Sequence, residues 1–141
     1  MLNYAFYSSK GINEESYYKV PDNESALLAF PQHKVNAKGH FKLSNNFSLN
    51  PSVTIKGKRY GFASLDPEEE ESVISEFDPL YLVHIYARYK NAFNLPLELG
   101  LGVNDIFGQH YMYIQPYDGW HSPFPGPSRE ITFKLKYHFN I

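Results

Sequence analysis

The residues in this 141-residue sequence that are of catalytic types form no constellation typical of an enzyme. The absence of cysteine excludes disulfide bonds, thiolate metal sites and thiol nucleophiles. Six histidines are present, but none forms a closely spaced pair that would place two metal ligands on one face. Asp105 with His110 or His121, beside Ser122, resembles a hydrolytic set without any nucleophile motif around it. We therefore expect a protein that is not an enzyme and that needs no metal or other cofactor.

Charge is segregated along the chain, although the formal net charge is only -2. Six basic residues and no acidic ones lie between residues 32 and 60, whereas acidic residues gather in two polar connections. The run Glu68 to Glu71 has the hard oxygen ligands that cations prefer, but like-charged blocks are more often solvated loop tips. The basic stretch "KGKRYG" lacks the stacking residues of a nucleic-acid module, so we expect no nucleic-acid partner.

The last segment of the chain, residues 131–141, indicates the type of secondary structure that positions the polar and charged groups. From Ile131 onward, apolar residues occupy every odd position and polar ones the even positions. A period of two indicates a β-strand with one apolar and one polar face. A high aromatic content, 17% of residues, also favours β-structure.

Five further segments have the same alternation, so the sequence predicts an all-β fold. We expect an antiparallel up-and-down meander of about six long strands; the predicted strands are residues 2–9, 33–43, 47–62, 80–90, 95–107 and 131–141. The connections between them alternate long, short, long, short, long. This alternation is typical of transmembrane β-barrels, in which short turns lie at one end and long loops at the other.

The lengths of the strands and the polar face support the membrane interpretation. Strands of about 9–11 residues cross a bilayer at a barrel's tilt, and lysines and histidines suit a wet lumen better than a packed core. No apolar run of about 18 residues predicts a membrane helix. The alternative is a soluble protein whose sheet has its charged face in water. The specific soluble protein that we consider is a lipocalin-like barrel that binds a small apolar ligand.

Aromatic residues fall near both ends of the predicted strands, as in the interfacial belts of membrane barrels. The expected belt at the short-turn end comprises Phe41, Phe47, Tyr89, Phe93, Tyr137 and Phe139. The expected belt at the loop end comprises Phe30, Tyr60, Phe62, Tyr81, Phe107 and Tyr111. Aromatic pairs also stabilise ordinary sheets. Pro51 opposes the strand prediction because it removes a backbone donor, and we expect a β-bulge there.

The fifth predicted strand and the residues after it resemble the C-terminal end of TonB-dependent outer-membrane receptors. The resemblance rests on a penultimate strand with a stretch of the V-x-N-L-F-x-x-x-Y type, a Pro-Gly-Arg-like corner and a last strand of alternating aromatics; the matching residues are Val103, Asn104, Ile106, Phe107, Tyr111, Pro125, Gly126, Arg129, Leu135, Tyr137 and Phe139. An earlier stretch resembles the family's Pro-x-His-Lys-x-Asn strand pair; it contains Pro31, His33, Lys34 and Asn36.

The resemblance implies that residues 1–141 are a C-terminal barrel segment without the plug domain and the earlier strands. The partners would be those missing parts, the lipid bilayer and, through the plug, the TonB energy-coupling system. The location would be the cell outer membrane. The implied function is ligand-gated active import of a scarce nutrient: a metal chelate, a saccharide or a peptide.

In such a receptor, specificity would lie in external loops where aromatic and polar groups orient the ligand. The last long connection carries the candidate ligand-binding residues Tyr111, Tyr113, Tyr117, Trp120 and His121. The alternative is that these aromatic residues close the loop upon itself as packing anchors.

Overall fold

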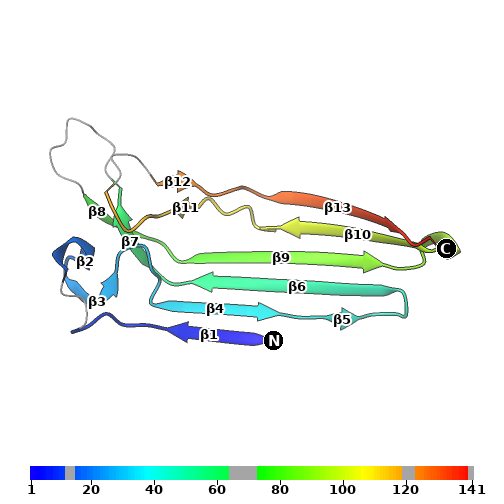
Figure 1. Ribbon diagram of the computed structural model, residues 1–141, viewed down its shortest axis with the longest axis horizontal. Coiled ribbons are helices and arrows are strands. Elements are labelled where there is room, and N and C mark those ends of the chain that lie inside the picture. Colours follow the sequence, from blue (N-terminus) through cyan, green and yellow to red (C-terminus); the bar gives the residue numbers. More distant parts are fainter. Residues whose placement is uncertain (12–14, 64–72, 119–122, 140–141) are drawn as a thin grey trace.

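The computed structural model describes residues 1–11, 15–63, 73–118 and 123–139 of the chain. Its main sheet is an antiparallel meander in which successive strands lie side by side (Figure 1). The path through the sheet runs along β1 (Leu2–Phe6), β4 (His33–Lys38), β6 (Phe47–Lys56), β9 (Leu80–Tyr89), β10 (Leu97–Asn104) and β13 (Glu130–Tyr137). The predicted all-β, up-and-down architecture is confirmed.

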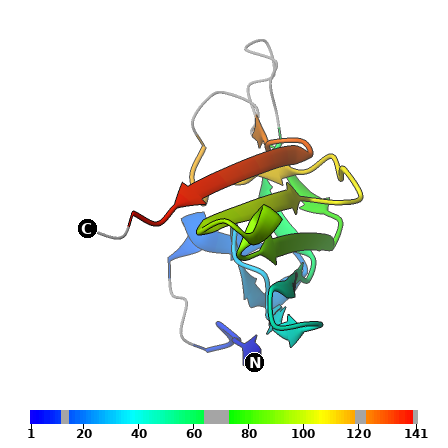
Figure 2. The same cartoon turned by 90° about the vertical axis from the view of Figure 1, so that its right-hand side faces the viewer.

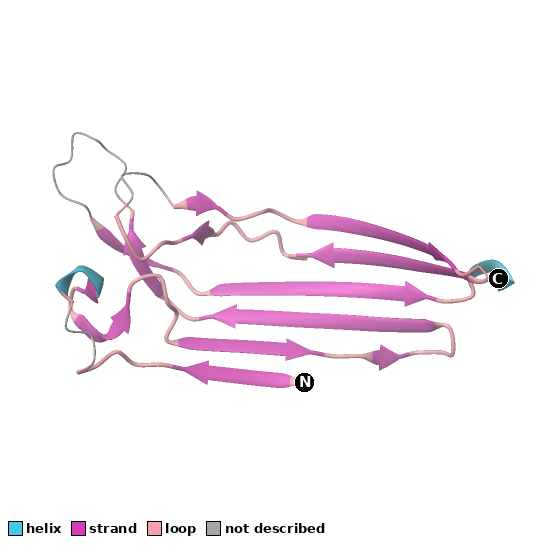
Figure 3. Cartoon of the chain, viewed as in Figure 1, coloured by secondary structure: helices cyan, strands magenta, loops and turns pink. Residues whose placement is uncertain are grey.

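Smaller elements are arranged around the two ends of this sheet (Figure 3). One end carries three short hairpins: β2 (Lys19–Val20) with β3 (Asn23–Leu27), β7 (Arg59–Phe62) with β8 (Ile74–Phe77), and β11 (Met112–Tyr113) with β12 (Phe124–Pro125). The 3-10 helix η1 (Ser16–Tyr18) precedes β2, and η2 (Ala92–Asn94) forms the turn between β9 and β10 at the opposite end. We call these the loop end and the short-turn end.

The strands are shorter than the sequence predicts. Of the main-sheet strands, β6 and β9 reach 10 residues each. The predicted third strand, residues 47–62, leaves the sheet after Lys56, where Gly57 N donates to His33 O (2.8 Å). Residues Arg59–Phe62 pair with β8 instead of continuing beside β9. The connection before β4, predicted as purely polar, contains the β2–β3 hairpin.

Pro51 produces a gap in hydrogen bonding, not the predicted bulge. The pairs on either side of it, Lys38 with Ser52 and Phe41 with Leu49, keep one constant register. Gly39 N donates to Pro51 O (2.9 Å), but proline has no N–H to return the bond. The second predicted strand, residues 33–43, is therefore divided into β4 and β5 (Phe41–Lys42).

The constant register aligns apolar side chains into rows that cross the sheet. One row passes from Phe41 through Leu49, Ala87 and Leu101 to Phe133. We call this side the apolar face and the other the polar face. The apolar face is not covered by other described elements: Leu101 is 51% exposed and Phe133 is 69% exposed. The sheet thus presents a continuous apolar surface to its surroundings, which in water would be costly.

The polar face is held together by side-chain contacts between strands. Thr54 Oγ1 donates to Asn36 Oδ1 (3.0 Å), and Asn50 Nδ2 donates to Tyr86 O (3.2 Å). The Tyr86 side chain occupies the space that a Cβ atom of Gly100 on β10 would need, and its ring also borders Gly102, where the Thr132 hydroxyl fills that space. The two glycines therefore let a large ring lie flat along the sheet.

The sheet stays open, because β1 and β13 lie on its opposite edges and do not pair (Figures 1 and 2). The described residues thus do not form the closed lipocalin-like barrel that was the soluble alternative, in which the apolar face would be enclosed. No helix in the described part of the chain is long and apolar enough to span a membrane.

The aromatic belts are present in part. Phe47 pairs with Tyr89 at the short-turn end, where the exposed Phe93 and Phe139 also lie. At the loop end, Tyr81 and Phe107 are exposed. Tyr60 and Phe62 depart from the prediction because they pack against a small local core.

The contact of Tyr86 with β10 predicts a specific pattern of stability. Gly100→Ala should destabilise the sheet by about 1–3 kcal/mol, because the new methyl group displaces the Tyr86 ring. In a Tyr86→Ala background the same substitution should cost close to nothing. Gly57→Ala is the matched control, since its Cβ would lie at an ordinary 3.4 Å from His33 O. Denaturant unfolding in detergent measures the wild type and all four variants, and additive costs for Gly100 and Tyr86 would contradict the contact.

Candidate functional site

The loop end has a hydrophobic core of its own. Val20, Ala26 and Leu28 from the β2–β3 region are buried, and Tyr60, Phe62 and Ile74 of the β7–β8 hairpin pack against them. Tyr7 fastens this unit to the start of the chain, because its hydroxyl accepts a hydrogen bond from Leu27 N (3.0 Å). Ala29 N donates to Tyr60 O (2.7 Å) and joins the two hairpins. This core gives the loop end a defined shape.

The last long connection covers the opposite face of β7. Strand alternation directs Tyr60 and Phe62 to the core and leaves Arg59 and Gly61 on the other side, where both are buried. Gly61 lies against Ile114 so closely that a Cβ atom would overlap it. Arg59 Nη1 donates to Met112 O (3.3 Å). The connection is thereby placed over the hairpin.

A cavity of about 310 Å³ lies between β7, the start of β9 and this connection. Its lining combines one arginine with aromatic, imidazole and carboxylate groups; the lining residues are Arg59, Phe77, Asp78, Pro79, Leu80, Gln109, His110, Tyr111 and Met112. Gln109 is fixed there because its Oε1 accepts a hydrogen bond from Tyr81 N (2.8 Å). Apolar walls with a few polar groups are the usual composition of a small-molecule site.

Arg59 is the most unusual residue of this cavity. It is 6% exposed, its Nε has no hydrogen-bond partner, and burial lowers the pKa of its guanidinium. An arginine remains charged in proteins, and a buried charge is costly unless it is paired. The side chain is therefore well suited to bind an anionic group that enters the cavity.

Tyr111 is the predicted ligand-binding residue that the structure places at the cavity. Its ring packs against Gly126 and meets Tyr113 edge to face, with ring centroids 5.5 Å apart. The two hydroxyl oxygens are 3.4 Å apart. Burial, the Tyr113 hydroxyl and the charge of Asp105 raise the pKa of Tyr111 to about 12. Tyr111 is thus a neutral hydrogen-bonding group at any physiological pH.

The other predicted site residues have different positions. Tyr113 and Tyr117 are exposed, at 54% and 59%, and Trp120 and His121 lie outside the described residues. The run Glu68 to Glu71 and Ser122 also lie outside them. Asp105 is buried, but it is not joined to His110 by any hydrogen bond that the structure records. No group of three metal-ligating residues occurs within the described ranges.

Sequence reasoning missed Arg59 as a site residue. The stretch "KGKRYG" lies within the predicted strand 47–62, and nothing in its composition shows that the strand leaves the main sheet. A signal was nevertheless present. Gly57 interrupts the alternation two residues before Arg59, and glycine within a strand often marks a bend.

Comparison with known proteins gives a fold relationship. No family model and no curated protein matches the sequence. Among solved structures, a chain of the FpvAI–pyocin S2 complex is similar with a TM-score of 0.66 and 17% identity over 82% of this chain. The ferric-catecholate import receptor Fiu of E. coli K12 has a TM-score of 0.64 and 17% identity over 84% of it. The ferripyoverdine receptor of the Pseudomonas aeruginosa outer membrane has a TM-score of 0.60 and 18% identity over 87% of it.

The chain has the fold of a segment of an outer-membrane receptor barrel. It spans 15% of the first of these structures, 16% of the second and 15% of the third. The resemblance to TonB-dependent receptors is confirmed at the level of the fold. The second of these structures is an import receptor, and the third is a receptor of the outer membrane.

The raised pKa of Tyr111 predicts how the loop end responds to alkaline pH. The unfolded tyrosine ionises near pH 10, whereas the folded one stays protonated to about 12. The contribution of Tyr111 to stability is therefore complete below pH about 10 and falls between pH about 10 and 12. The difference in ultraviolet absorbance between the wild type and Tyr111→Phe should titrate with a midpoint near pH 12 in the folded chain. The same difference in concentrated denaturant should titrate near 10 and serves as the control; equal midpoints would contradict the burial of Tyr111.

Proposed function

We propose that residues 1–141 are the C-terminal segment of an outer-membrane receptor that actively imports a scarce nutrient. The main support for this proposal is the apolar face. Six strands form it in constant register, and no other described element covers it. In water such a face would drive aggregation. In a bilayer it would contact hydrocarbon, and the backbone groups of the inner strands would keep their partners within the sheet, apart from the one bond lost at Pro51. The fold likeness to import receptors supports the same conclusion.

This proposal assigns an environment to each face and each end of the sheet. The apolar face contacts lipid, and the polar face with its lysines, arginine and glycines borders a hydrated lumen. Short turns of such barrels lie in the periplasm and long loops outside the cell. The short-turn end with η2 therefore faces the periplasm, and the cavity at the loop end faces the exterior.

The proposed partners follow from the open edges. β1 and β13 each have one side without a neighbouring strand, and unpaired edges cannot face hydrocarbon. The remaining strands of the receptor would pair with them, and the plug domain would lie in the lumen. TonB would supply energy through that plug.

A metal chelate is the ligand class that we favour among the three considered. The similar structures include a ferric-catecholate import receptor, a ferripyoverdine receptor and a ferric enterobactin receptor. Such chelates bear anionic oxygen donors and aromatic or amide groups. The Arg59 guanidinium and the Tyr111 hydroxyl could recognise these groups together in the 310 Å³ cavity.

The membrane assignment predicts a difference between adjacent residues of β13. Phe133→Lys should destabilise the barrel by about 2–4 kcal/mol, because the lysine enters hydrocarbon. Thr132→Lys places the same charge on the polar face and should change stability by about 0.5 kcal/mol or less. Urea unfolding in lipid vesicles measures both. Equal costs for the two variants would mean that lipid does not contact the apolar face.

The ligand assignment predicts that Arg59 contributes to chelate binding. In a receptor containing this segment, Arg59→Gln should weaken the binding of ferric enterobactin or ferripyoverdine by about tenfold, through loss of a charge-assisted hydrogen bond. Lys134→Gln removes one cation from the far end of the polar face and should leave binding unchanged. Radioactive iron bound to whole cells is the measurement. If the Arg59→Gln receptor binds both chelates as tightly as the wild type does, the loop-end cavity is not the ligand site.

A further inference from the structure

A second polar pocket lies at the short-turn end, far from the cavity that contains Arg59. It has a volume of about 230 Å³ and is lined by residues of β5, β6, β9 and the turn between β5 and β6; the lining residues are His40, Lys42, Ser44, Asn45, Asn46, Phe47, Ser48, Arg88 and Lys90. None of these nine described residues is acidic. The pocket therefore concentrates positive charge without an internal counter-ion.

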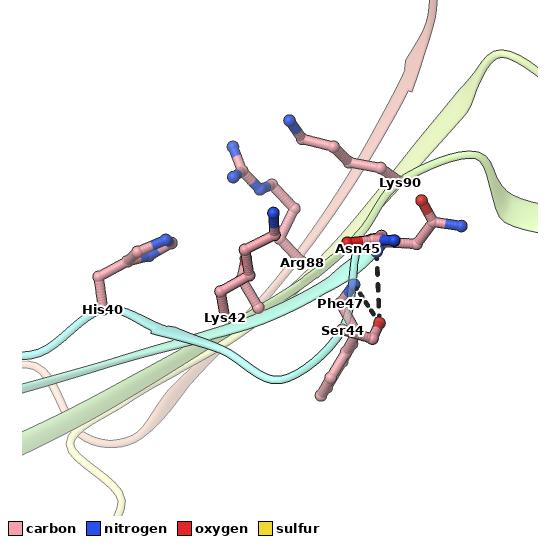
Figure 4. A pocket seen from close by; sticks show the side chains of 9 residues that line it. His40, Lys42, Ser44, Asn45, Phe47, Arg88 and Lys90 are labelled. Carbon is pink, nitrogen blue, oxygen red and sulfur yellow. Dashed lines mark hydrogen bonds between the residues drawn. The ribbon is translucent and has the colours of Figure 1, made fainter.

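Strand register explains why the cations converge. Lys42 pairs with Ser48, and Ser48 pairs with Arg88, so all three side chains project from the polar face. Two strand spacings separate Lys42 from Arg88, or about 10 Å. In Figure 4 the side chains of Lys42, Arg88 and Lys90 point to the same side of the sheet, whereas the Phe47 ring points to the other.

The pocket is fixed by hydrogen bonds of its own. Ser44 Oγ accepts from the backbone N–H of Phe47 (3.0 Å) and holds the turn, as Figure 4 shows. His40 Nδ1 lies 2.6 Å from Asn50 Oδ1. Since an amide oxygen can only accept, this histidine nitrogen donates. Glu98 of β10 lies opposite Lys136 of β13 in the strand register.

A buried hydroxyl indicates that something polar belongs in this pocket. Ser48 is 6% exposed, lies between Lys42 and Arg88, and its Oγ has no hydrogen-bond partner. A buried polar group without a partner costs free energy. A bound oxyanion would accept from the Ser48 hydroxyl and compensate the cations on both sides.

We propose that this pocket binds a doubly charged oxyanion, either free phosphate or a phosphate monoester. Arg88 supplies a planar, two-pronged donor that matches phosphate oxygens. Lys42 and Lys90 neutralise its charge, and Ser48 donates the remaining hydrogen bond. This site is independent of nutrient binding at the loop end and lies on the lumen side near the short turns.

Phosphate titration of the chain in a maltoside detergent and a phosphate-free buffer tests the site. Calorimetry should detect binding to the wild type that falls by about tenfold in Arg88→Gln, the loss expected for a charge-assisted hydrogen bond. Ser48→Ala should weaken it by a smaller factor. Lys34→Gln removes a cation from the same face at the other end of the sheet and should have no effect. Circular dichroism confirms equal strand content in all four proteins.

Chemical acetylation of the wild type provides a readout that needs no variant. Phosphate should protect Lys42 and Lys90 from acetylation, while Lys34 and Lys56 in the same molecule remain reactive. Equal protection of all four lysines, or of none, would overturn the proposal. Glycerol phosphate compared with inorganic phosphate identifies the source: tighter binding of the ester assigns the site to an esterified group, and tighter binding of phosphate assigns it to the free ion.

Discussion

The structure depends on one constraint: strand register that stays constant across the whole sheet. Each side chain of a strand changes face if the strand slips by one residue. The pairs on β4, β6, β9, β10 and β13 keep the residues of the apolar face opposite one another across the sheet. Even Pro51, which lacks a backbone donor, leaves the register unchanged and costs one hydrogen bond to Gly39. A bulge there would have brought lysines to the apolar face.

This register also creates the chemistry of the polar face. Because the apolar rows are aligned, the polar rows between them are aligned as well, and cations from distant parts of the sequence become neighbours. Lys42, Arg88 and Lys134 occupy one row with Ser48 and Gly100 between them. The glycines on β10 leave room for the Tyr86 ring, which occupies the space that a Cβ atom of Gly100 would need. The same face thus combines tight local packing with unpaired charge.

The loop end follows a different principle, because it is stabilised by a packed core and not by extended strand pairing. Val20, Ala26 and Leu28 form its centre, and the β7–β8 hairpin separates this core from the last long connection. Tyr60 and Arg59 are adjacent in sequence, yet one packs into the core and the other lines a cavity. In the proposed receptor, this small rigid unit beside the main sheet would hold ligand-contacting groups in place.

The alternation of residue types by itself determined the six long strands of the main sheet and the identity of their two faces, since a period of two requires no long-range information. The alternating lengths of the connections indicated the antiparallel meander. The sequence also placed candidate ligand residues in the last connection, of which Tyr111 lines the cavity. The strand ends, the departure of β7 from the sheet and the burial of Arg59 were decided by tertiary contacts alone. These features arise where a hairpin from residues 19–27 packs against Tyr60 and Phe62. Such packing joins segments far apart in the chain, and no local pattern encodes which of them will meet.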